Sequence, residues 1–424
     1  MITFKNKIIT GDFLSNLSVL TLGTLVSQAI VFIFYPILAR IYTPAEFGVI
    51  SLVYMLSSLL AVFASGAAEG AIVISKSRTT AVHVIGWIVI RSTLVFLSFF
   101  IITIFLFKVN ISIIAKEVLL WLPVVPLFAA SIIYFNCINE WLLIENNLLQ
   151  MTRLIILQSL AVSSIRSFLG IFNFLINGLV IGEILGKLIT IFIGLSSIFN
   201  KHKQYFLSLK LIKIESIKRK YKDFPKYMMP DQLINIIGGT IHIPFLSLAF
   251  GVTELGYISM SMSILYFPVS VISSAIKDVF RQQATIEFKL TGSCRKLYLK
   301  LLLPVSLIGL IGFGIIYILS SKLFLFLLGD AWIPVGEYVK ILTPLFFLNF
   351  VSMSMGGVLI ITQQLKISLS WQIINTTMTL LAIIIGVIYF QTVIATLWGV
   401  TIAKSFAYLI HIFISYHFSD SSAK

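Results

Sequence analysis

The stretch "IYTPAEFGVISLVY", residues 41–54, places a proline, a glutamate and a glycine between two long apolar runs. A blurred copy, "AFGVTELGYISMSM", returns at residues 249–262. A shift of 208 residues aligns the two copies without a gap, with more identities than this composition gives by chance. The identical pairs are Pro36/Pro244, Leu38/Leu246, Glu46/Glu254, Gly48/Gly256, Ile50/Ile258, Ser51/Ser259, Ser65/Ser273 and Ala67/Ala275. The chain is therefore expected to contain two related halves.

The polar residues of the first copy are typical of a turn followed by a helix start. Thr43 can cap the helix, Pro44 suits its first turn, and Glu46 favours the positive end of the helix dipole. In the second copy we expect Thr253 and Glu254 to act in the same way. Each copy then forms the hairpin between the first two helices of its half.

Two further pairs of the repeat bear on helix shape. Pro36 and Pro244 fall in the last turns of the preceding apolar runs, where a missing backbone donor kinks a helix. Gly48 and Gly256 fall one turn into the following runs, where small residues allow close packing. These residues indicate architecture, and each is also explained by a well-capped hairpin with no further role.

Composition identifies the class of protein. Hydrophobic residues make up 58% of the chain and charged residues 11%, which is too little polar surface for a soluble body of this size. Runs of about 20 apolar residues suit helices that cross a bilayer, whereas a barrel would show alternation with period two. The sequence thus predicts an all-α integral membrane protein with about twelve spans. They are residues 13–38, 46–74, 81–106, 118–139, 148–172, 174–199, 228–250, 257–284, 299–320, 338–361, 368–389 and 392–416.

The distribution of basic residues predicts the orientation. With the N-terminus inside, and with residues near the ends of spans counted with the adjoining loops, the inward side holds 22 of the 31 Lys and Arg, the outward side holds 5, and 4 lie deeper within spans. Both termini are therefore expected in the cytoplasm. The net charge of +15 is explained by anionic phospholipid headgroups as partners. The basic residues lack the aromatic interleaving of a nucleic-acid binder, so no nucleic-acid partner is expected.

The densest basic segment lies near the midpoint of the chain. Residues 201–226 combine lysines with apolar residues and are expected to form a cytoplasmic interfacial linker. It separates an N-terminal six-helix lobe, residues 1–200, from a C-terminal six-helix lobe, residues 227–424. Six spans separate the two copies, so the copies run in the same direction through the membrane. In such parallel repeats the substrate binds between the halves.

No enzymatic, metal or cofactor motif emerges from the sequence. Cys137 and Cys294 lie far apart, and the histidines form no metal-ligand pattern. "GEILGK" at residues 182–187 is one residue short of a phosphate-binding loop, and no Ser or Thr follows its lysine. The glycines of that run, spaced by four, are better explained as a helix-packing strip. We expect no catalytic residue, no metal, no cofactor and no ATPase.

The stretch "PILARIYTPAEFGVISLVYMLSSLLAVFASGAAEGAIV", from residue 36, resembles the Wzx-type polysaccharide flippases. These belong to the multidrug/oligosaccharidyl-lipid/polysaccharide exporter superfamily. The likeness is clear over residues 13–80 and looser afterwards, where "LFLFLLGDAWIPVGEYVKIL" at residues 323–342, the repeat and the total length support it. No single motif in this family is as specific as a phosphate-binding loop.

The resemblance implies two lobes around a central cavity in the bacterial inner membrane. It implies an undecaprenyl-pyrophosphate-linked oligosaccharide as substrate, such as an O-antigen unit, moved from the cytoplasmic to the periplasmic leaflet. A polysaccharide polymerase and a chain-length regulator are the further partners to consider. The sugar and the coupling ion leave no linear motif.

Cations at membrane depth are the first candidates for contact with an anionic headgroup, since each costs about 2.5 to 3.5 kcal/mol at a helix centre. They are Arg166, Arg91, Lys404 and Lys187. Arg166 has no acid within a turn of its own helix, whereas Glu183 precedes Lys187 by four residues and can form an ion pair with it. Arg91 can snorkel toward the interface.

A second group lies near the inner ends of the second and eighth spans. The repeat places Glu69 opposite Lys277, with Asp278 and Arg281 following, so that these residues can gate the path or touch a headgroup. Ordinary interfacial charges explain them equally well. Residues for gating or proton coupling are Glu69, Asp231, His242 and Glu140, although a satisfied buried polar residue is the commoner explanation.

Two other functions are weighed against the flippase. A drug or cation antiporter of the same superfamily should place acidic residues in its cavity, whereas the intramembrane set here leans basic. A membrane enzyme such as a polymerase or ligase usually needs a sizeable outward domain. The longest outward loops expected here, about residues 107–117 and 321–337, are short.

Overall fold

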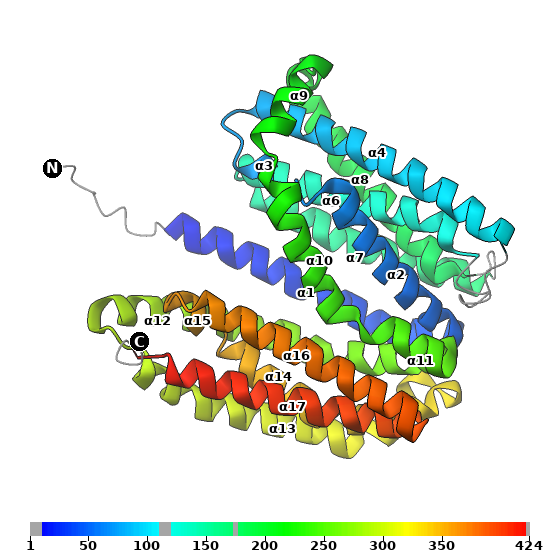
Figure 1. The fold of residues 1–424 in the computed structure, drawn as a ribbon, viewed down its shortest axis with the longest axis vertical. Helices are drawn as coiled ribbons and strands as arrows, with labels where there is room; N and C mark the ends of the chain where they lie inside the picture. The colour runs from blue at the N-terminus through cyan, green and yellow to red at the C-terminus, as the bar shows by residue number, and fades with distance from the viewer. Residues whose placement is uncertain (1–10, 110–119, 173–176, 421–424) are drawn as a thin grey trace. The chain divides into compact units, whose positions relative to one another are not determined.

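The computed structural model describes residues 11–109, 120–172 and 177–420. Within these ranges the chain folds into helices and contains no β-strand (Figure 1). The predicted outward loop at residues 107–117 lies largely outside the described residues. The all-α class expected from the apolar runs is confirmed.

The chain divides into two compact units. The N-terminal unit comprises residues 1–34 and 52–237, and the C-terminal unit comprises residues 35–51 and 238–424. The first repeated stretch, residues 41–54, thus lies mostly in the C-terminal unit, although it belongs to the first half of the sequence. The boundary near residue 237 follows the basic segment, which folds with the N-terminal unit.

The N-terminal unit is built from long helices joined by short turns. α1 spans Gly11–Ile41 and α2 spans Pro44–Ser65, and the last residues of α1 and the first of α2 belong to the C-terminal unit. The remaining helices are α3 (Gly70–Val73), α4 (Arg78–Val109), the 3-10 turn Leu122–Val124, α6 (Val125–Ile144), α7 (Leu148–Ile171), α8 (Gly178–Leu207), α9 (Leu211–Lys220), the π-turn Phe224–Met228 and α10 (Met229–Thr240).

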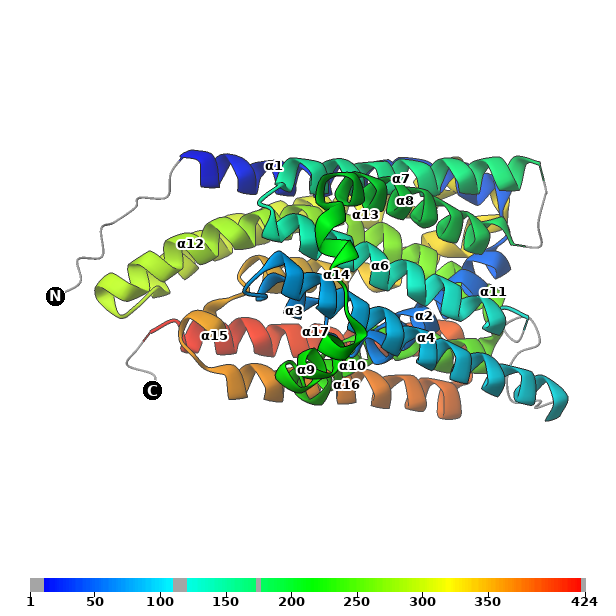
Figure 2. The same ribbon diagram turned by 90° about the horizontal axis from the view of Figure 1, so that it is seen from above.

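Helix α6 supplies much of the core of this unit. Its Phe128, Ile133 and Trp141 are buried. Helices α7 and α8 run side by side in Figures 1 and 2, and α8 also packs on α6. The glycines of the 182–187 run lie at the α7 contact, as the sequence predicted: a Cβ on Gly186 would come within 2.6 Å of the Val162 Cα. The two backbones can meet this closely only because glycine has no side chain.

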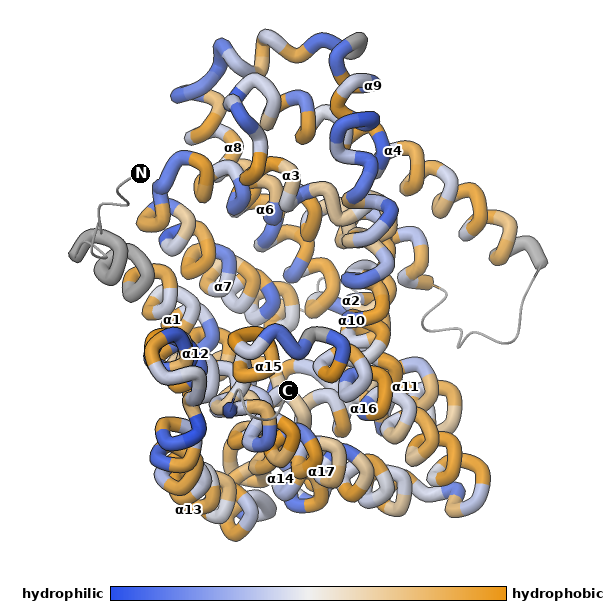
Figure 3. Tube along the Cα trace, turned by 60° about the vertical axis from the view of Figure 1, so that its left-hand side comes forward, coloured by the Kyte–Doolittle hydropathy of each residue, from blue (hydrophilic) through white to orange (hydrophobic). Residues whose placement is uncertain are grey.

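The basic segment forms α9, which packs on α4. Its Ile214, Ile217 and Tyr221 are buried, while the lysines between them are exposed. Just before α9, the backbone N–H of Lys210 donates to His83 Nε2 on α4 (3.2 Å), and His83 Nδ1 bonds to the Thr79 carbonyl. Figure 3 shows hydrophilic residues gathered in this segment and hydrophobic residues along the long helices. One face of α9 is therefore anchored to the N-terminal unit.

The C-terminal unit contains the remaining helices. They are α11 (His242–Pro268), the π-turn Val269–Ser273, α12 (Ser274–Thr291), α13 (Arg295–Leu328), the 3-10 turn Asp330–Trp332, α14 (Ile333–Ser354), α15 (Val358–Ile361), α16 (Leu365–Ile385), the π-turn Gly386–Phe390 and α17 (Val393–His417). Helix α14 packs against α11, α13 and α17, which surround it in Figure 1. Its Val339, Leu342 and Phe350 form part of the core.

A buried tryptophan holds the end of α1 and the start of α2 in the C-terminal unit. Trp332 Nε1–H donates to the Ala39 carbonyl (2.7 Å), and its ring contacts Phe47 edge to face at 5.1 Å. Arg40 Nη2 also donates to the Phe326 carbonyl (2.9 Å). Because Trp332 is fully buried, these contacts fix residues 35–51 to this unit.

Eleven helical segments of the described chain are long and apolar enough to cross a membrane. One of them, Phe224–Thr291, has 68 residues and is far longer than a bilayer requires. Gly251 interrupts it with φ +86° and ψ 169°, which divides it into two crossings. The structure therefore accounts for about twelve spans, and the protein is a multi-pass membrane protein.

The two repeated hairpins meet at their glycines within the C-terminal unit. A Cβ on Gly48 would lie 1.9 Å from the Val252 carbonyl oxygen, and a Cβ on Gly256 would lie 1.7 Å from the Pro44 carbonyl oxygen. The residues of the two contacts are related by the same shift of 208 found in the sequence, so the crossing is symmetric. Close packing at these glycines was expected within each hairpin, whereas the glycines pack the two copies against each other.

The polar part of the second copy differs from the prediction. In the first copy Glu46 Oε2 accepts from the Thr43 backbone N–H (2.8 Å) and hydroxyl (2.9 Å), so that the Glu46 carboxylate reaches back to the backbone of Thr43, as in one half of a capping box. In the second copy Gly251 occupies the turn position, and Glu254 accepts from the Tyr338 hydroxyl (2.6 Å). The expectation that Thr253 and Glu254 repeat the cap is therefore wrong, because α14 provides a partner for Glu254.

Candidate functional site

Three charged residues form a cluster between α7 and α8 in the N-terminal unit. Arg166 Nη2 lies 2.6 Å from Glu183 Oε2, and Lys187 Nζ lies 3.0 Å from Glu183 Oε1. The three side chains are 10% to 16% exposed. All three residues lie within candidate membrane spans. In the ion pairs of the described residues, this cluster places two cations against one carboxylate.

The helix contact positions this cluster. A Cβ on Gly182 would lie 2.7 Å from Arg166 Cγ and 2.9 Å from Arg166 Cα, so the arginine backbone fits directly over this glycine. Arg166 Nε–H also donates to the Leu179 carbonyl in the first turn of α8 (3.0 Å). Glu183 and Lys187 are one helical turn apart, which brings their side chains together. The glycine therefore determines which acid the arginine reaches.

Aromatic rings surround the lysine. Its Nζ lies 4.7 Å from the ring centroid of Phe128 on α6 and 5.6 Å from that of Tyr54 on α2. Ring faces attract cations, and the attraction grows when water is excluded. Four helices of the unit, α2, α6, α7 and α8, thus build one cationic site, which can bind an anionic group such as a phosphate.

The sequence predicted part of this cluster. The ion pair between Glu183 and Lys187 is present. The expectation that Arg166 lacks an acid on its own helix also holds, but α8 supplies Glu183 from the neighbouring helix. Spacing within one helix could not reveal a pairing between two helices, so the inclusion of Glu183 in the site was missed.

Arg91, Glu69 and Glu140 come together in a second place in the N-terminal unit. Arg91 Nη2 donates to the Phe63 carbonyl (3.0 Å), and the guanidinium lies against Gly66, where a Cβ would meet it at 1.9 Å. Glu69, in the turn between α2 and α3, interacts electrostatically with both Arg91 and Glu140. The arrangement is one cation beside two carboxylates.

Glu69 has a shifted pKa. Burial raises the pKa of its carboxyl above the ordinary value, and the charge of Glu140 adds to this. Hydrogen bonds to the backbone and to Ser65, together with the charge of Arg91, act in the opposite direction. A carboxyl in this environment can hold a proton at a higher pH than an exposed one.

The other predicted residues lie apart from these clusters. Lys404 of α17 lies close enough to His242 of α11 for their charges to interact, within the C-terminal unit. Lys277 and Arg281 of α12 lie over the Gly356–Gly357 turn, where Cβ atoms would approach their side chains to 3.6 Å. Glu69 and Lys277 belong to different units. Asp231 is exposed on α10, within the N-terminal unit.

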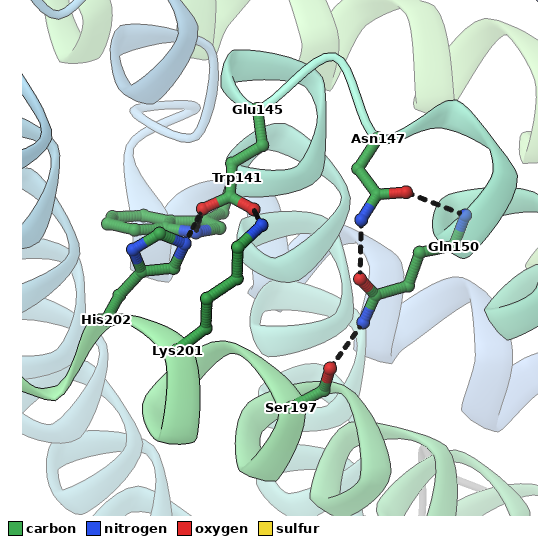
Figure 4. A network of polar contacts seen from close by, with 7 residues as sticks. All are labelled: Trp141, Glu145, Asn147, Gln150, Ser197, Lys201 and His202. Atoms are coloured by element: carbon green, nitrogen blue, oxygen red, sulfur yellow. Dashed lines mark hydrogen bonds and ion pairs between the residues drawn. The ribbon is translucent and has the colours of Figure 1, made fainter.

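A third polar network was missed by the sequence analysis. Figure 4 shows Glu145, at the end of α6, between Trp141, Lys201 and His202. Trp141 Nε1–H donates to Glu145 Oε1 (3.0 Å), Lys201 Nζ lies 3.3 Å from Oε2, and His202 Nε2 contacts Oε1. The sequence carries one signal for this network: Glu145 is a single acid, and Lys201 of the basic segment follows it 56 residues later.

A neighbouring set of amides joins the same helices. Asn147 accepts the N–H of Gln150 with its side-chain oxygen (3.2 Å), which starts α7. Gln150 then donates to Ser197 on α8 (2.8 Å), as Figure 4 shows.

The described residues contain no group of three or more His, Cys, Asp or Glu placed to hold a metal ion.

Comparisons with known proteins place this architecture in a family. Residues 37–337 match the model of the family described as polysaccharide biosynthesis protein. A comparison with curated proteins finds no match.

Several solved structures share the fold. The lipid II flippase MurJ in an inward closed conformation has a TM-score of 0.71 at 14% identity, over 94% of this chain and 89% of that one. An inward-facing multidrug resistance MATE transporter of the MOP superfamily gives 0.65 at 13%, over 92% and 93%. An outward-facing MATE transporter gives 0.57 at 16%, over 94% of both chains. The chain belongs to the polysaccharide biosynthesis protein family and has the two-lobed helical fold of the MurJ and MATE transporters.

Proposed function

We propose that this protein is a flippase that moves an undecaprenyl-pyrophosphate-linked oligosaccharide across the bacterial inner membrane. The sugar unit is an O-antigen repeat or a similar surface polysaccharide unit, carried from the cytoplasmic to the periplasmic leaflet. The family concerns polysaccharide biosynthesis, and a similar fold belongs to a protein named for flipping lipid II. In this proposal both termini are cytoplasmic, as the distribution of basic residues indicates.

The observation that carries the proposal is the cluster of Arg166, Glu183 and Lys187. A charge at membrane depth is costly, and the ion pairs of the described residues bring two cations to one carboxylate here. Two cations beside one carboxylate suit an anionic pyrophosphate. Arg166 and Lys187 are the headgroup ligands in this proposal. The further cations along the transport path are Arg91, Lys404, Lys277 and Arg281.

The test is a deletion with complementation in a strain that displays the polysaccharide. Deletion should abolish surface polymer, the intact gene should restore it, and Arg166→Ala should restore less while its protein level in the membrane stays unchanged. Arg153→Ala, an exposed arginine on the same helix, is the control and should restore fully. Normal surface polymer after the deletion, in a strain without another flippase, would refute the proposal.

A drug or cation antiporter of the same superfamily is the second proposal. Glu69 favours it, because burial raises the pKa of this carboxyl and Glu140 lies within electrostatic reach. Such a pair can exchange a proton for a cationic substrate, with His242 and Asp231 as further proton carriers. Purified protein in vesicles with an imposed proton gradient would distinguish the two, since only the antiporter would accumulate a cationic dye.

A further inference from the structure

A cavity between α4, α6 and α8 in the N-terminal unit is separate from the charged cluster described above. Its volume is about 210 Å³. Residues from all three helices form its wall, among them Ile85, Val89, Cys137, Trp141, Leu195 and Phe206. Val89 and Leu195 are 38% and 45% exposed, so the cavity opens at the surface of the unit.

The lining excludes water and favours a hydrocarbon. A buried water needs two to four polar partners, and the indole N–H of Trp141 already donates to Glu145. The remaining wall is built almost wholly of carbon. Because α4, α6 and α8 are candidate membrane spans, a lipid acyl chain is the hydrocarbon that an opening between them would meet in a bilayer.

Cations lie close to one end of the cavity. The ring of Trp141 lies 5.7 Å from that of His202, which lies 6.0 Å from Tyr205, and Arg78 Cζ lies 6.0 Å from the Tyr205 centroid. Lys201 is adjacent, with a side chain that is 63% exposed (Figure 4). Glu145 is the acid that contacts Lys201 and His202 at this end, while Glu69 and Glu140 interact electrostatically with Cys137 of the cavity wall.

The charge at this end is therefore positive. Arg78 and Lys201 against Glu145 leave one excess positive charge, and Arg78 forms no ion pair among the described residues. An aromatic ring beside a cation above an apolar cavity suits an amphiphile with an anionic head and a hydrocarbon tail.

We propose that this cavity binds one chain of an anionic phospholipid whose phosphate lies beside Arg78. The site is on the N-terminal unit alone and holds a resident lipid rather than the transported substrate. Its role is to fill the space between α4, α6 and α8 and to hold the basic end of α8 near the headgroups. The kink of α8 at His202, with φ −127° and ψ 20°, lies beside this end.

Labelling with a photoreactive lipid locates the site in the unmodified protein. The probe is phosphatidylglycerol with a diazirine in one acyl chain, and crosslinked peptides are identified by mass spectrometry. The label should fall on peptides of α4, α6 and α8 that line the cavity. Unlabelled phosphatidylglycerol should compete, whereas phosphatidylcholine with the same chains should compete about fivefold less.

Matched variants test the contact with the lipid headgroup and the contact with the acyl chain separately. Arg78→Gln should lower the labelling about fivefold, which is the effect of one basic residue on an anionic lipid, and Arg153→Gln should not change it. Leu195→Trp should fill the cavity and lower the labelling by the phosphatidylglycerol probe, whereas Phe192→Trp, exposed on the same helix and outside the cavity, should leave it unchanged.

The outcomes decide the proposal in either direction. Label on other helices, equal competition by the two lipids, or equal labelling of the Arg78→Gln and Arg153→Gln proteins would overturn it. Displacement by glycerol phosphate, which has the charge without the chains, would also overturn it, because binding would not need the cavity. An absence of label in the unmodified protein would likewise overturn the proposal.

Discussion

The two copies of the repeated hairpin, residues 41–54 and 249–262, share a backbone contact and differ in their polar contacts. Gly48 and Gly256 each face a carbonyl oxygen of the other copy. Glu46 caps its own turn at Thr43, whereas Glu254 is bonded to Tyr338 of α14. The two copies thus share the backbone contact between their helices, whereas the polar side chains around this contact bond to different partners.

The same contrast extends to the cations of the two units. In the N-terminal unit Glu183 balances part of the charge of Arg166 and Lys187. In the C-terminal unit Lys404 lies near His242 and forms no ion pair among the described residues. The membrane-depth cations of the two related halves therefore have different neighbours. Four predictions test the contacts that the halves share and those in which they differ.

The largest effect is expected for Glu183→Gln. The substitution leaves Arg166 and Lys187 in a partly buried site without their carboxylate. Breaking a buried ion pair from one side costs about 3 to 5 kcal/mol, and the exposed fraction of these side chains favours the lower end. Thermal unfolding of the purified protein in detergent should show this loss.

Glu215→Gln is the matched control for that variant. Glu215 pairs with Lys218 and Arg219 on α9 at 3.8 Å and 3.6 Å, with side chains that are more than half exposed. Exposed pairs contribute about 0 to 1 kcal/mol. If both variants unfolded at the same temperature, the cluster would not be the buried pair described here.

Gly48→Ala and Gly256→Ala test the symmetric contact. Each added methyl group would meet a backbone carbonyl oxygen, so the helices must separate, at a cost of about 1 to 3 kcal/mol. The two costs should be alike, because the two contacts are related by the repeat. In Gly312→Ala the methyl group meets no atom within 4 Å, and stability should hold or rise. Clearly unequal costs would contradict the symmetry.

Tyr338→Phe and Glu46→Gln test the asymmetric part of the hairpins. Tyr338→Phe removes a part-buried bond to a charged acceptor and should cost about 1.5 kcal/mol. Glu46→Gln weakens exposed bonds at a helix start and should cost about 0.5 kcal/mol. Denaturation of both variants under one condition gives the comparison, and a reversed order would show that the second hairpin does not rely on α14.

The smallest effect is expected from the titration of Glu69. Its pKa in the folded protein is raised by burial above the ordinary 4.5, so the unfolded chain loses the proton first as pH rises. Stability is therefore full below that value and falls as pH rises toward the raised pKa. Glu69→Gln should remove the fall in thermal stability that begins as pH rises above about 4.5, while Glu215→Gln should keep it. Identical pH profiles of the wild type and Glu69→Gln would contradict the assignment.

Most of the fold follows from patterns that are local in the chain. Apolar runs locate the helices, and the ungapped repeat picks out Gly48 and Gly256 as packing positions, although their partners are in the other copy and not in their own hairpin. The end of α2 was not predicted: the apolar run continues, but Gly66 and Ala67 adopt positive φ values of 70° and 54° and break the helix. Arg91, from another helix, packs against Gly66 in this turn.

The site was predicted only where its residues share a helix. Glu183 and Lys187 are four residues apart, so their pairing could be inferred. The pairing of Arg166 with Glu183, and of Glu145 with His202, depends on how separate helices pack. That packing is set by glycines and core side chains, which hydropathy alone does not place in space.

The most direct test of the central claim uses purified protein in vesicles with an ion gradient. An undecaprenyl-pyrophosphate-linked oligosaccharide is placed in one leaflet, and its arrival in the other is followed with an impermeant lectin or glycosidase. We predict transfer well above that of protein-free vesicles, reduced by Arg166→Ala and unchanged by Arg153→Ala. Transfer no faster than in protein-free vesicles, under every gradient tested, would contradict the claim.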